Sequence, residues 1–106
     1  MKTADRTSDR DDGSKALVRE MKVSNSLGLH ARPAALFVKT ASSFDADVKV
    51  ERDGNVVSGK SIMGLMTLQA ECGSVLRVTA RGRQAKNVLD SLERLFKEQF
   101  SESYQA

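Results

Sequence analysis

Segments with the hydrophobic spacing of strands and segments with that of helices alternate along this chain. Their order limits the folds that it can adopt. Apolar and polar side chains alternate in residues 17–23, 46–51 and 74–80, which is the pattern of strands with one buried face. Asp53-Gly54 forms a tight turn after the second of these segments and leads into a short strand at residues 55–58. The sequence therefore predicts four strands, two of them joined as a β-hairpin.

Three other segments carry apolar residues at the 3.6-residue spacing of helices. Pro33 is the only proline, and a helix tolerates proline only in its first turn, so Pro33 places the start of the first helix. Ser61 is a suitable N-cap for a short helix over residues 62–69, which we expect Gly73 to close at its far end. Residues 85–96 carry the clearest apolar stripe and predict a third helix.

The predicted order β-α-β-β-α-β-α belongs to the α+β class. We expect an open-faced β-sandwich, in which three helices cover one face of a four-stranded, mainly antiparallel sheet and the other face meets water. The length of 106 residues suits one domain. Residues 1–15 contain four basic and four acidic side chains and almost nothing to bury, which predicts a mobile N-terminal tail ahead of a domain at residues 16–106.

Composition excludes several classes of protein. No apolar run approaches the roughly 18 residues of a membrane helix, and the first residues have no apolar signal-peptide core, so we expect a cytoplasmic protein without membrane insertion. With a single Cys72 and a single His30, no cluster is available for an internal disulfide or a metal site. We expect neither a metal nor a cofactor.

The stretch NSLGLHARPAA, residues 25–35, holds the only histidine of the chain. With Pro33 in the first turn, His30 lies at or next to the N-cap, where backbone N–H groups have no intrahelical partner. A phosphoryl group on the imidazole would meet the amides of the segment Ala31 to Pro33, the positive end of the helix dipole and the guanidinium of Arg32. This combination favours an imidazole that holds an anion.

The same residues are compatible with other roles for His30. A single histidine at a helix start is usually a capping or surface residue, and the residues alone leave that alternative open. A serine-hydrolase triad is disfavoured because the chain has no G-x-S-x-G segment. Gly28 permits a sharp turn and carries no side chain, so we expect the phosphorylated residue of a partner to approach His30 at this point.

The stretch SGKSIMGLMTL, residues 58–68, is apolar on nearly every side of its predicted helix. We expect Leu65 and Leu68 to enter the core. Ile62, Met63 and Met66 are expected to form an exposed docking patch, because exposed methionines adapt to more than one partner surface.

LGLHARPAA and GKSIMGLMTL resemble the two signature stretches of the HPr family, the histidine-containing phosphocarriers of the bacterial phosphoenolpyruvate-dependent sugar phosphotransferase system. The resemblance extends over residues 17–96 in order and spacing. It implies an HPr-like open-faced sandwich. It also implies a carrier, rather than a stand-alone enzyme, that takes a phosphoryl group from enzyme I and passes it to the enzyme IIA components of sugar permeases.

When the roles of family residues are assigned to the matching positions here, the resemblance implies that His30 is phosphorylated on Nδ1. It also implies that Arg32 helps to bind and release the phosphoryl group. Ser61 matches the serine that an ATP-dependent HPr kinase/phosphorylase modifies in many bacteria, and a transcriptional regulator is a further implied partner. We expect Lys39 and Lys60 to help dock acidic partner faces. We also expect phosphorylation of Ser61 to slow that of His30 with little change in fold, and the protein to be a monomer.

Two rival functions stay open. The first is a paralogous phosphocarrier in a regulatory phosphorelay, nitrogen-related or otherwise. The second is a small basic nucleic-acid-binding module, given the net charge of +3. It is disfavoured because four phenylalanines and one tyrosine, none in a basic strand pattern, provide no stacking platform. Near the start of the last helix, Arg81, Arg83 and Lys86 are expected to form a solvated basic face, with a second anion-attracting patch as the alternative.

Overall fold

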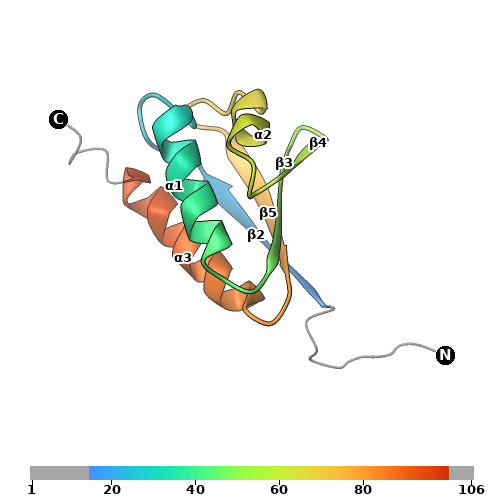
Figure 1. Ribbon diagram of the computed structural model, residues 1–106. Helices are drawn as coiled ribbons and strands as arrows, with labels where there is room; N and C mark the ends of the chain where they lie inside the picture. Colours follow the sequence, from blue (N-terminus) through green and yellow to red (C-terminus); the bar gives the residue numbers. More distant parts are fainter. Residues whose placement is uncertain (1–14, 101–106) are drawn as a thin grey trace.

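Four antiparallel strands form one sheet in the structure, a computed structural model that describes residues 15–100 (Figure 1). The edge strand β2 (Ala16–Lys22) pairs with β5 (Val75–Arg81), and β5 pairs with β3 (Asp47–Arg52). The hairpin partner of β3, β4 (Asn55–Ser58), forms the other edge. The predicted sheet is confirmed, while the predicted tail lies outside the described residues except for Lys15.

Three helices cover one face of this sheet, namely α1 (Ala31–Ser42), α2 (Ile62–Thr67) and α3 (Ala85–Lys97) (Figure 1). The predicted order of strands and helices is therefore confirmed. α1 contacts both α2 and α3, and α3 also packs on β2 and β5. Within residues 15–100, none of the helices has the length and apolarity that crossing a membrane would require.

The core lies between the sheet and the helices. The strand β5 shows the predicted alternation, with Leu76, Val78 and Ala80 buried and the intervening side chains turned to the open face. On the helix side, the ring of Phe37 in α1 meets Phe96 of α3 edge to face, with centroids 6.1 Å apart. This packing fixes α1, and with it the loop that leads into α1.

The end of α2 differs from its prediction. The helix stops at Thr67, Leu68 is its C-cap, and the chain turns at Gln69, which has a φ of +51°. The Nη1 group of Arg52 donates a 2.9 Å hydrogen bond to the carbonyl oxygen of Leu68 and so satisfies a group that the helix end exposes. The prediction that Gly73 closes the helix is wrong, because the helix has already ended before that residue.

An ion-pair cluster joins β2 to α3. The Nη1 group of Arg19 lies 2.7 Å from Oδ1 of Asp90 and 3.1 Å from Oε1 of Glu93, and Nζ of Lys86 lies 2.9 Å from Oδ2 of Asp90. The hydrogen bonds from Lys86 and then Arg19 lower the pKa of Asp90 below its usual value of 3.8. The same cluster raises the pKa of Arg19, chiefly through the hydrogen bond to Asp90.

The lowered pKa of Asp90 gives a pH-dependent stability. The folded-state pKa is below the unfolded one, so the carboxylate stabilises the fold above the unfolded-state value and this contribution is lost as the pH falls through the folded-state pKa. We expect Asp90→Asn to lower the Tm slightly at pH 7 and to have a smaller effect at about pH 2. Thermal denaturation followed by circular dichroism at both pH values measures this. An equal loss of Tm at both would exclude a charge effect.

Candidate phosphate-acceptor site

His30 is the N-cap residue of α1. Its backbone is extended, with φ −85° and ψ −166°, and its side chain does not cap the helix. The N–H of Ala34 donates to the carbonyl oxygen of His30 at 3.0 Å, and Pro33 has no N–H group. Ala31 and Arg32 therefore supply the first-turn N–H groups that an anion on the imidazole could approach.

Hydrogen bonds within the loop before α1 position His30. The side-chain amide of buried Asn25 donates to the carbonyl oxygen of Gly28 at 2.6 Å, and the N–H of His30 donates to the same oxygen at 3.0 Å. The next N–H, that of Leu29, donates across to the carbonyl oxygen of Ala70 at 2.8 Å. This role of Asn25 was not predicted from the sequence, although asparagine at the start of a turn is a known signal for such bonds.

The backbone of Gly28 lies close to another loop of the same protein. It is buried, with a φ of +74°, and a Cβ at this position would lie 2.5 Å from the carbonyl oxygen of Ala70 and 3.0 Å from Cα of Glu71. The predicted sharp turn is confirmed. The expectation that a partner approaches at Gly28 is wrong, because the loop between α2 and β5 already occupies that space.

Substitution of Gly28 is expected to be costly. Gly28→Ala combines a left-handed backbone, unfavourable for any residue with a Cβ, with a clash against backbone atoms that cannot rotate away. We expect it to lower the free energy of unfolding by about 2–4 kcal/mol. The control is Gly54→Ala, since Gly54 has a φ of +86° but nothing within 4 Å of its added Cβ, so that only the backbone cost applies. Urea denaturation compares the two variants. Equal losses would show that the contact with Ala70 has no effect on stability.

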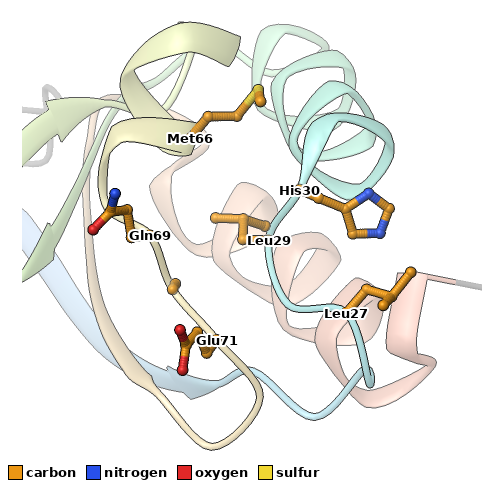
Figure 2. A pocket seen from close by; sticks show the side chains of 7 residues that line it. Leu27, Leu29, His30, Met66, Gln69 and Glu71 are labelled. Carbon is orange, nitrogen blue, oxygen red and sulfur yellow. The ribbon is translucent and has the colours of Figure 1, made fainter.

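A pocket of about 380 Å³ lies beside His30 (Figure 2). It is formed by two segments that are distant in the sequence, the loop before α1 and the segment that runs from α2 toward β5. Its lining residues are Leu27, Leu29, His30, Met66, Gln69, Ala70 and Glu71. Leu27 is 73% exposed, which places a large apolar side chain at the surface next to the imidazole.

The predicted docking residues of α2 are exposed. Ile62, Met63 and Met66 are 40%, 72% and 38% exposed, while Leu65 and Leu68 are buried, so the predicted division of this helix is confirmed. Met66 also lines the pocket beside His30. Binding of partners by these three residues stays a prediction.

Ser61 is the N-cap residue of α2, as its sequence position predicts. Its Oγ accepts a 3.0 Å hydrogen bond from the N–H of Gly64. The neighbouring Lys60 is exposed. Lys39 lies in the last turn of α1, about 14 Å along the helix from His30, so the structure does not bring it next to His30.

The remaining candidate residues lie on the surface. Arg81, Arg83 and Lys86 are all exposed, and Lys86 belongs to the ion-pair cluster with Asp90. Cys72 is exposed, with its Sγ 3.7 Å from the carbonyl oxygen of Ser24. In the part of the chain that the structure describes, no three His, Cys, Asp or Glu side chains gather as metal ligands could.

Comparison with known proteins agrees with this geometry. Residues 17–98 match the family described as PTS HPr component phosphorylation site. The phosphocarrier protein HPr of Treponema pallidum is 44% identical over 86 residues, covering 81% of this chain and 98% of that protein. The HPr-like protein Crh of Bacillus subtilis is 43% identical over 74 residues, or 70% of this chain and 87% of Crh. The crystal structure of HPr from Bacillus anthracis superposes with a TM-score of 0.73 at 42% identity, covering 76% of this chain and 96% of that one. The resemblance seen in the sequence is thereby confirmed: this chain belongs to the HPr family of phosphocarrier proteins.

Proposed function

We propose that His30 accepts a phosphoryl group from phosphorylated enzyme I, which takes it from phosphoenolpyruvate, and passes it to enzyme IIA components of sugar permeases. The observation that carries this proposal is the position of His30, an N-cap residue whose side chain does not cap its helix, in a member of a phosphocarrier family. The protein would act in the cytoplasm as a monomeric carrier without a cofactor, rather than as a stand-alone enzyme.

The proposed transfer needs positioning more than added catalytic groups. Nδ1 of His30 attacks the phosphorus of the phosphohistidine of enzyme I, and the phosphorus–nitrogen bond on enzyme I breaks as the new one forms. With the imidazole proton on Nε2, no proton has to move in this step. The N–H groups of Ala31 and Arg32 and the guanidinium of Arg32 would take up the negative charge of the phosphoryl oxygens. Neutral amides and one arginine hold the group weakly enough for release to the next protein.

We further propose that Ser61 regulates this transfer when an ATP-dependent HPr kinase/phosphorylase modifies it. A phosphoserine adds a charge of about −1.5 to −2 beside Ile62 and Met63, within the proposed docking patch. A transcriptional regulator that recognises the Ser61-phosphorylated form would be a further partner.

A regulatory phosphorelay without sugar transport is the second candidate function. The likeness to Crh of Bacillus subtilis supports a regulatory role, because that protein is described as a catabolite repression HPr and its structure superposes with a TM-score of 0.57 at 40% identity. The two candidates share the chemistry of His30 and differ in the protein that receives the phosphoryl group.

The direct test is incubation with phosphoenolpyruvate and purified enzyme I. We expect stoichiometric label that is labile in acid and stable in alkali, as a phosphorus–nitrogen bond is. Adding IIA domains should then discharge the labelled protein, whereas a regulatory relay would leave it charged in their presence. Absence of label on the intact protein with active enzyme I would contradict the phosphocarrier role.

A further inference from the structure

Gln69 has a backbone conformation that residues with side chains rarely adopt. It follows Leu68, the C-cap of α2, and has a φ of +51°. Glycine adopts this left-handed conformation without a steric penalty, whereas every residue with a Cβ is disfavoured there. Such conformations are retained where the surrounding structure requires them, and they concentrate at functional sites.

The fold accounts for the backbone of Gln69. The turn at this residue lies between two carbonyl groups with fixed partners, that of Leu68, which accepts from Arg52 at 2.9 Å, and that of Ala70, which accepts from Leu29 at 2.8 Å. The second bond holds the loop that carries His30. A glycine at position 69 would provide the same turn at lower cost, so the fold does not account for a glutamine.

The side chain of Gln69 faces outward beside the transfer site. It is exposed, and it lines the pocket that His30 also lines. Among residues 15–100, no hydrogen bond holds its amide. In Figure 2 the amide and the imidazole of His30 point in different directions, so the amide does not face a phosphoryl group on His30 and is open to contacts from outside.

We propose that Gln69 is a partner-binding residue whose side-chain amide hydrogen-bonds the protein that donates the phosphoryl group to His30. This proposal rests on the proposed function and adds a contact to it. The amide offers two N–H donors and one carbonyl acceptor, so it can pair with backbone or polar groups on the surface of enzyme I. Its contribution lies in binding the donor protein, and the transfer step itself does not use it.

The test compares Gln69→Ala, Gln69→Gly and Gln99→Gly in phosphoryl transfer from enzyme I. Both changes at Gln69 remove the amide, and we expect each to raise the KM for phosphorylated enzyme I about fivefold with kcat unchanged, as loss of one hydrogen bond predicts. Gln99 is a matched control, because it is an exposed glutamine with a φ of +53° that does not line the pocket. Gln99→Gly should leave both constants at parental values.

Thermal denaturation separates the effect of losing the side chain from the effect of relieving the backbone strain. Gln69→Gly relieves the left-handed strain and should have a higher Tm than Gln69→Ala, while the two share the same KM. The proposal would be overturned by a parental KM in either Gln69 variant. It would also be overturned if Gln99→Gly raised the KM as much as the changes at Gln69. If the parent accepts no phosphoryl group from enzyme I, the proposed function itself fails, which is a different result from a functional parent with unchanged variants.

Discussion

His30→Ala is expected to abolish phosphorylation by enzyme I, with a loss of at least about 10³-fold in the rate of labelling. The reason is chemical, because the substitution removes the imidazole of the only histidine in the chain and with it the proposed nucleophile. The fold should persist, since the side chain of His30 is half-buried and makes no capping bond. Transfer of label from phosphoenolpyruvate through enzyme I measures the effect.

Ser26→Ala is the matched control for His30→Ala. Ser26 is an exposed residue of the same loop, and it should label at the parental rate. Circular dichroism should show the same helix content and a similar Tm for both variants. If His30→Ala labels as well as the parent, the carrier interpretation is wrong and the acceptor is another residue.

Ser61→Asp is expected to slow the acceptance of phosphate from enzyme I by roughly 10²-fold, because like charges facing each other across an interface cost several kcal/mol. The local effect has the opposite sign. Aspartate is a good N-cap residue and can accept from the N–H of Gly64 as Ser61 does, and a negative charge at a helix start stabilises it by about 0.3–1 kcal/mol. The interface effect is larger, so transfer should fall while the Tm stays close to that of the parent.

Ser61→Asn separates the effect of the negative charge from the effect of helix capping. Asparagine has nearly the same shape as aspartate and caps helices equally well, but it is neutral. We therefore expect Ser61→Asn to transfer at the parental rate with a parental Tm. Equal slowing in the two variants would assign the effect to side-chain size, and parental transfer by Ser61→Asp would remove the argument for regulation by charge.

The sequence predicts most of the strands and helices well because they bury one face, and burial imposes the period that the residues show. The strand β4 has no buried residue, and it was predictable from the Asp53-Gly54 turn instead. The end of α2 could not be predicted in this way. There a glutamine, Gln69, takes the left-handed turn that glycine normally takes, and the helix end is satisfied by Arg52 from a distant strand. Neither the left-handed turn at Gln69 nor the contact from Arg52 has a signal in the sequence next to the helix end.

The same reasoning applies to the site. Pro33 and the helical spacing after it were sufficient to place His30 at the N-cap, because both are local signals. The pocket beside His30 was not predictable, since its walls come from residues 27–30 and 66–71, which meet only in the folded protein. The role of Gly28 was misjudged for this reason, because the group that it approaches belongs to Ala70.

The strand order has a consequence for the synthesis of this protein on the ribosome. Within residues 15–100, β2 pairs with β5 alone and β5 separates β2 from β3, so β2 lacks this partner until Val75–Arg81 has emerged. The β3–β4 hairpin involves only nearby residues and can form earlier. The loop that carries His30 is anchored to Ala70 as well, so it is also held in place late. The nascent chain should therefore expose His30, the proposed acceptor, for some time before the pocket beside it has assembled.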